Sequence, residues 1–115
     1  MGGRQDGELL PGTFETLLLK ALSLGPMHGW GVAQRIESLS GGVFSIQQGA
    51  VYPALQRLTR RRLISAEWRD SENNRRARFY KLTAAGRRAL NSETESWRRV
   101  IGGLERVLRA TTQEG

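Results

Sequence analysis

Residues 64–83 read ISAEWRDSENNRRARFYKLT. Two runs within this stretch, residues 64–69 and 76–82, carry aromatic and β-branched side chains, and the polar segment DSENN separates them. Strand-forming runs on either side of turn-forming residues are typical of a β-hairpin. Because side chains alternate between the two faces of a strand, we expect Tyr80 and Leu82 to point into a core. The hairpin limits the fold classes that the rest of the chain can complete.

Three helices are predicted before the hairpin. The first starts at Pro11 and stops at Gly25-Pro26, since glycine and proline together break a helix. A compact loop over residues 27–31 leads to a short second helix. Both helices carry apolar residues at helical spacing, which we expect to point inward: Phe14, Leu17, Leu18, Ala21 and Leu22 in the first, and Val32, Ala33, Ile36 and Leu39 in the second.

The third helix carries Val51, Leu55 and Leu58 on one face. Pro53 has no N–H group and is tolerated only in the first turn, so this helix should begin near Gln48 or Gly49. Three helices, a hairpin and a further helix form the order of a winged helix-turn-helix. In that fold the third helix enters the major groove of DNA and the hairpin is the wing.

The last helix is predicted to run from an N-cap at Thr83 to about Arg109. Along one side of this helix, six residues follow one another at alternating spacings of four and three, as in the seam of a coiled coil: Leu90, Thr94, Trp97, Ile101, Leu104 and Leu108. A helix of about 25 residues is ~38 Å long, which exceeds what so small a domain covers, so we expect the same helix of a second copy to pack on it. Gly102-Gly103 interrupts the helix at a cost of about 2 kcal/mol, and either a kink or the close approach of a neighbouring helix explains it.

The predicted fold is therefore mainly α with a small β-hairpin wing. A flexible tail (residues 1–8) precedes a winged helix-turn-helix domain (9–83), and a dimerisation helix (84–110) and a second flexible tail (111–115) follow it. The length of 115 residues is appropriate for one such domain with one added element.

Basic residues are concentrated in one third of the chain. Eleven of the eighteen basic residues lie between Arg57 and Arg88, beside only three acidic ones, whereas the net charge of the whole chain is +7. Sixteen of the eighteen are arginine, whose planar guanidinium suits phosphate and guanine edges. This distribution indicates a polyanionic partner, with a solvated basic face as the alternative.

The candidate DNA-binding residues fall into two groups. On the third helix, glutamine amides can read adenine and Tyr52 can donate to a phosphate; the set is Gln47, Gln48, Tyr52, Gln56, Arg57 and Arg60. In the wing, basic side chains near the turn can straddle the backbone or enter the minor groove; the set is Arg69, Asn73, Asn74, Arg75, Arg76 and Arg78. Trp68 is expected to pack in the hairpin rather than to stack on bases.

Catalytic and cofactor motifs are absent from the sequence. There is no cysteine, the single histidine (His28) is expected to be a hydrogen-bonding group in a loop, and no glycine-rich loop of a nucleotide-binding kind occurs. We therefore expect no enzyme activity, no cofactor and no metal. With no apolar run long enough for a membrane span and no apolar stretch at the N-terminus, a cytoplasmic location is expected.

Several segments together resemble the PadR family of transcriptional regulators: LLPGTF (9–14), GPMHGWG (25–31), GAVYPAL (49–55) and the wing segment from Glu67 to Thr83, with Gly86. The resemblance implies a homodimeric repressor that binds double-stranded DNA at an operator with dyad symmetry. The short length is similar to that of the subfamily with one C-terminal helix.

In multidrug-sensing members of the family, a tryptophan of the last helix stacks on flat aromatic drugs at the dimer interface. Trp97 lies in a comparable place, with Ile101, Leu104 and Leu108 beside it, so the resemblance suggests a small aromatic effector. An ordinary packing role for Trp97 stays open. Two other functions also remain possible from the sequence: a winged helix that docks on an acidic protein, and RNA binding, which would require exposed aromatic side chains.

Overall fold

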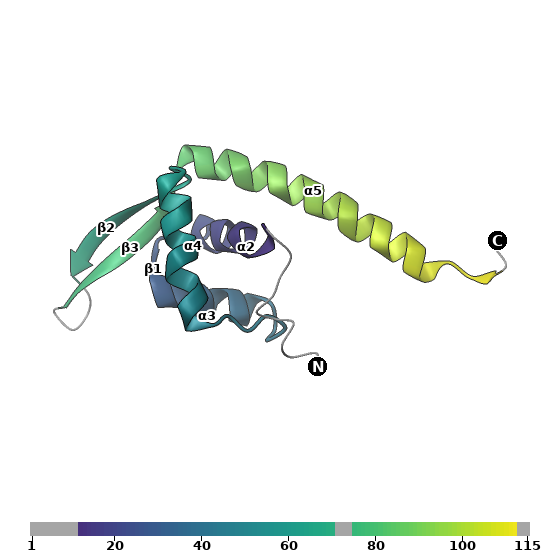
Figure 1. The fold of residues 1–115 in the computed structure, drawn as a ribbon, viewed down its shortest axis with the longest axis horizontal. Helices are drawn as coiled ribbons and strands as arrows, with labels where there is room; N and C mark the ends of the chain where they lie inside the picture. The colour runs from purple at the N-terminus through teal and green to yellow at the C-terminus, as the bar shows by residue number, and fades with distance from the viewer. Residues whose placement is uncertain (1–11, 71–74, 113–115) are drawn as a thin grey trace.

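The computed structural model describes residues 12–70 and 75–112. In chain order it contains the helices and strands α2 (Thr13–Ser23), β1 (Met27–His28), α3 (Gly29–Leu39), α4 (Gln48–Arg60), β2 (Ile64–Asp70), β3 (Arg76–Leu82) and α5 (Ala84–Arg109). Figure 1 shows α2, α3 and α4 grouped beside a β-hairpin, with α5 leading away along the longest axis of the molecule, 64 Å. The predicted winged helix fold with one C-terminal helix is confirmed.

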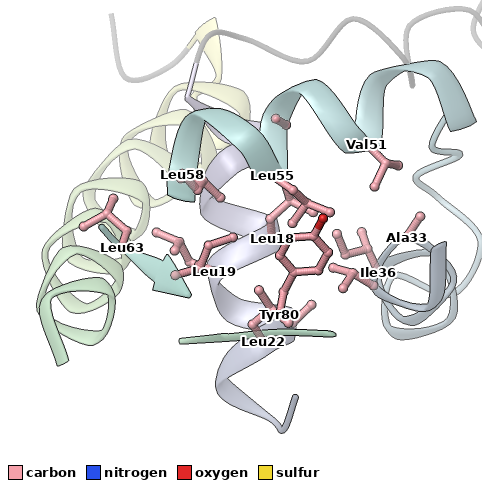
Figure 2. Packing of buried hydrophobic residues seen from close by; sticks show 14 of the residues in the cluster. Leu18, Leu19, Leu22, Ala33, Ile36, Val51, Leu55, Leu58, Leu63 and Tyr80 are labelled. Carbon is pink, nitrogen blue, oxygen red and sulfur yellow. The ribbon is translucent and has the colours of Figure 1, made fainter. Parts of the chain in front are cut away.

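The core lies where α2, α3 and α4 meet the sheet. Leu18 of α2, Val32 of α3 and Leu55 of α4 have no exposed surface, and Figure 2 shows the leucines of α2 and α4 facing one another. The predicted inward face of α4 is confirmed, as is its start at Gln48, but the expectation that Pro53 lies in the first turn is wrong, because it is the sixth residue and lies inside the helix. The prediction for Leu39 is wrong: its side chain is 62% exposed, because the last turn of α3 extends beyond the core.

The sheet has three strands in the order β1-β3-β2. The compact loop predicted over residues 27–31 is wrong, because Met27 pairs with Tyr80 and His28 pairs with Phe79, and α3 begins directly at Gly29. This pairing satisfies backbone groups at the edge of β3 that would otherwise remain open. His28 nevertheless forms a local hydrogen bond, since its Nδ1 accepts from the N–H of Gly31 at 3.1 Å and caps α3.

The register of the hairpin assigns its side chains to two faces. Ala66 pairs with Tyr80 and Trp68 pairs with Arg78, so the even-numbered residues of β2 and β3 share one face. Tyr80 is buried as predicted, whereas Leu82 is only half-buried at the border of the core. Trp68 lies outside the core and is 55% exposed, because the strands extend past the core. Within the hairpin its ring contacts the guanidinium groups of Arg76 and Arg78.

Two hydrogen-bonded turns fix α5 to the rest of the fold. Arg62 ends α4 with a positive φ of 62° and directs the Leu63 carbonyl toward the Thr83 N–H, which donates to it at 3.1 Å. The predicted N-cap is confirmed, since Thr83 Oγ1 accepts from the N–H of Gly86 at 3.0 Å. Gly86 is required here because a Cβ would lie 2.0 Å from the Leu63 carbonyl oxygen. The helix then continues to Arg109 through Gly102-Gly103 without a break.

Candidate nucleic-acid interface

Helix α4 presents one buried and one exposed face. Val51, Ala54, Leu55 and Leu58 are buried, and this orients the other side of the helix toward solvent. All six residues predicted for DNA contact at this helix are exposed: Gln47, Gln48, Tyr52, Gln56, Arg57 and Arg60. Their exposure agrees with the 100° step of an α-helix from the apolar face.

Tyr52 is held in place by α3. An ideal Cβ at Gly29 would lie 2.5 Å from Cε1 of the Tyr52 ring, so the ring rests against the bare backbone at the start of α3. The side chain of Tyr52 stays 46% exposed despite this contact. The fold therefore braces the tyrosine ring while part of the residue stays accessible, which orders a potential hydrogen-bond donor before any ligand arrives.

A notch joins α4 to the wing. It has a volume of about 330 Å³, and its lining comes from both elements: Tyr52, Gln56, Thr59, Arg78 and Tyr80. Burial raises the pKa of the Tyr80 hydroxyl, and the neighbouring Arg78 guanidinium opposes part of that rise. The Tyr80 hydroxyl therefore stays protonated, and the positive charge of the notch comes from Arg78.

Arg57 lies differently from the other predicted contact residues. Its Nε donates to Glu15 Oε2 of α2 at 2.9 Å, and Arg61 Nη1 reaches Glu15 Oε1 at 3.3 Å. Glu15 thus ties the C-terminal end of α4 to α2 and offsets part of its positive charge. The sequence analysis missed this residue because its partners lie more than forty positions away.

The wing arginines divide between the two faces of the hairpin. Arg76 and Arg78 share the even-numbered face with Trp68, and Arg78 lies in the notch. Arg69 lies on the opposite face, where it pairs with Glu67 and has its guanidinium 5.2 Å from the centre of the Phe79 ring. Arg75 is exposed. The predicted contacts at Asn73 and Asn74 lie outside the described residues.

The seam of α5 is covered only near its N-terminal end. Leu90 is buried and Trp97 is half-buried, whereas Ile101, Leu104 and Leu108 are 50%, 56% and 79% exposed. Between α2 and α5 lies a groove of about 650 Å³, and most of its lining surface is apolar. Its residues include Leu17, Phe44, Leu90, Trp97 and Ile101.

Residues 12–70 and 75–112 contain no group of three or more potential metal ligands. Within the same ranges, no helix is long and apolar enough to cross a membrane.

Residues 18–92 match the sequence profile of the PadR-like transcriptional regulator family, which covers α2, α3, α4, the wing and the first part of α5. The chain belongs to this family. As a PadR-like protein, it is a DNA-binding transcriptional regulator, and the family is one of regulators rather than enzymes.

Known proteins similar to this PadR-like chain include both curated sequences and solved structures. An uncharacterized protein X of Lysinibacillus sphaericus is 22% identical over 81% of this chain and 85% of its own length. A 37.1 kDa protein of a Streptomyces fradiae transposon is 38% identical over 76% of this chain, although the match spans only 24% of that protein. The crystal structure of a PadR-like transcriptional regulator from Bacillus cereus superposes with a TM-score of 0.78 at 21% identity, covering 91% of this chain and all of that one.

Proposed function

We propose that this PadR-like chain is a homodimeric repressor that binds double-stranded DNA at an operator with dyad symmetry. The notch between α4 and the wing carries this proposal. Its lining combines Gln56 and Tyr52 of the helix with Arg78 of the wing, so one continuous surface offers both amide groups for base edges and positive charge for phosphates. RNA binding and docking on an acidic protein are the alternatives that the same surface leaves to experiment.

DNA binding is tested by selection from a random duplex library followed by sequencing. A dimer selects two inverted half-sites whose centres lie about one helical turn apart, or a multiple of it. Gln56→Ala should weaken the preference at particular base pairs, whereas Arg76→Ala should lower affinity for all duplexes and reduce the salt slope by about 0.9. Enrichment of no sequence at all, or tighter binding to single-stranded RNA than to the enriched duplex in a competition titration, would contradict the proposal.

The homodimer is supported by the exposed apolar stripe of α5. Val100, Ile101, Leu104, Val107 and Leu108 are each at least half exposed, and a stripe of this kind on a soluble domain is typical of an association surface. Gly102 and Gly103 fit the same interpretation, because nothing in the described part of the chain lies within 4 Å of a Cβ at either position. In the proposed dimer, α5 of the second copy is the close neighbour that these small residues permit.

Light scattering during gel filtration measures this association. Leu104→Lys should convert the dimer to a monomer with an unchanged fold, since the side chain is already exposed in a single chain. Leu24→Lys is the matched control, because Leu24 is 53% exposed at the C-cap of α2 and is not among the residues that line the groove between α2 and α5. A Leu104→Lys protein that stays dimeric would contradict a seam on α5.

We further propose that a flat aromatic ligand releases the repressor from DNA by binding beside Trp97. The groove of about 650 Å³ supports this, because it has the size of a small-molecule site and Trp97 forms part of its apolar lining. Planar aromatic compounds should quench the fluorescence of Trp97, measured as the difference between the wild type and Trp97→Phe. A quench that is equal in both proteins, or a ligand that leaves DNA affinity unchanged, would contradict the effector site.

A further inference from the structure

Trp68 has an unusual environment for an exposed aromatic residue. Trp68 is 55% exposed on the even-numbered face of the wing, and two guanidinium groups lie over its ring. The Cζ atom of Arg78 is 5.4 Å from the ring centre and that of Arg76 is 5.9 Å away. A guanidinium at such a distance is attracted by the electron-rich face of the ring. Trp68 therefore restricts two arginine side chains that would otherwise sample many rotamers.

Arg78 is restricted on a second side as well. It pairs with Trp68 across the hairpin, and it lines the notch together with Tyr80, Tyr52 and Gln56. Its guanidinium lies close enough to the Tyr80 hydroxyl to affect the pKa of that group. The indole thus holds a positive charge near the Tyr80 hydroxyl, at the junction of wing and α4. A charge fixed in advance loses less conformational entropy when it binds a ligand.

We propose that Trp68 is a positioning residue, which holds the Arg78 guanidinium in the notch where it meets one phosphate of the DNA backbone. The proposal rests on the proposed DNA binding. A phosphate fits the chemistry, because arginine offers a planar set of N–H donors to its oxygens, and Tyr52 and Gln56 add a hydroxyl and an amide. Among the described residues that line the notch, none carries a negative charge.

The opposite face of the wing supplies a matched comparison. Arg69 lies 5.2 Å from the centre of the Phe79 ring and pairs with Glu67, so it also joins a guanidinium to an aromatic ring. It does not belong to the residues that line the notch. Arg69→Ala and Arg78→Ala remove the same charge from the same hairpin, so a difference between them reports position rather than total charge.

The test measures the affinity for two labelled duplexes by fluorescence anisotropy, at salt concentrations of about 50 to 200 mM. One duplex has a sequence enriched from the random library, and the other has a scrambled sequence. Arg78→Ala should reduce the salt slope by about 0.9 and weaken both duplexes by the same factor. Trp68→Ala should weaken binding by about 2- to 5-fold, the factor expected from an exposed cation–π contact, whereas Trp68→Phe should restore most of the affinity. Trp68 also contacts Arg76, so the two substitutions are combined in an Arg76→Ala background, where Trp68→Ala should change the affinity no further once Arg78→Ala is present.

Each outcome has a separate meaning. If the wild type binds neither duplex, the proposed function fails and this inference fails with it. If the wild type binds but Trp68→Ala does so equally well, or if the two substitutions add in full, then Trp68 does not act through Arg78. If Arg69→Ala weakens binding as much as Arg78→Ala, the notch is not a distinct phosphate site.

A loss confined to the enriched duplex would point to a base contact and overturn the phosphate assignment. Equal melting temperatures of wild type and Trp68→Ala exclude a general loss of fold as the cause.

Discussion

Replacing Gly86 by alanine tests how tightly the first turn of α5 is held against the rest of the fold. A Cβ at this position would lie 2.0 Å from the carbonyl oxygen of Leu63 and 2.7 Å from Cδ1 of Leu82. The Leu82 side chain can rotate away, but the carbonyl oxygen is backbone. An ordinary contact begins at 3.4 Å, so α5 and the backbone around Leu63 must separate by more than about 1 Å.

The magnitude follows from the contacts that this movement disturbs. The Gly86 N–H donates to Thr83 Oγ1 at 3.0 Å, and the Thr83 N–H donates to the Leu63 carbonyl at 3.1 Å. Loss of a helix cap costs about 1 kcal/mol, a backbone hydrogen bond about 1 kcal/mol and overpacking about 1–3 kcal/mol. The better helix propensity of alanine returns about 1 kcal/mol. We expect the free energy of unfolding to fall by about 3 kcal/mol and the Tm by roughly 10 °C.

Thermal unfolding followed by far-UV circular dichroism, at one protein concentration for all variants, measures this effect. Gly49→Ala is the matched control, because Gly49 also lies in the first turn of a helix and nothing in the described part of the chain lies within 4 Å of a Cβ there. The control should melt at or slightly above the wild-type temperature. Gly86→Ala and Gly49→Ala proteins with equal Tm values would refute the close contact between α5 and Leu63.

Three further substitutions have defined outcomes. Glu15→Gln removes the carboxylate that pairs with Arg57 of α4 and with its C-cap, Arg61, so the free energy of unfolding should fall by less than about 1 kcal/mol. Because the two arginines then keep their full positive charge, the DNA affinity and its salt slope should rise in an anisotropy titration. Arg62 has a positive φ of 62°, a conformation that glycine adopts without strain, so Arg62→Gly should raise the free energy of unfolding by about 0.5–1 kcal/mol in a urea titration. No gain would mean that the arginine side chain stabilises the turn. Gly29→Ala should displace the Tyr52 ring and weaken duplex binding about as much as Tyr52→Phe does, and an unaltered affinity would show that the braced ring has no role.

The sequence predicts the helices and the hairpin well because their signals are local. Thr83 fixes the start of α5 through its hydroxyl, which requires no knowledge of distant contacts. The start of α4 is predicted correctly, although Pro53 lies inside the helix rather than in its first turn. The arginine-rich segment likewise indicates the wing from composition alone. These features share the property that the deciding residue and its effect lie within a few positions of each other.

The features that the sequence does not predict depend on distant partners. β1 has only two residues, too few for an alternating pattern, and its partner strand is about fifty positions away. Glu15 gains its role from arginines of another helix. For Trp68, the alternation of side chains along β2 predicts which face of the hairpin it lies on. Whether that face is buried depends on how far the core extends along the hairpin, which the sequence does not show. A weak signal did exist, since Trp68 lies among the wing arginines.

One residue, Thr83, connects the wing to α5, and its consequence is mechanical. Thr83 is bonded to the Arg62 carbonyl, the Leu63 carbonyl and the Gly86 N–H, so β3 and α5 meet at a stiff joint rather than at a loop. A helix of 26 residues is a lever about 39 Å long, and a tilt of about 5° at the joint moves its far end by roughly 3 Å. A helix held in this way turns together with the wing, so a small rotation of the wing produces its largest displacement at the far end of α5.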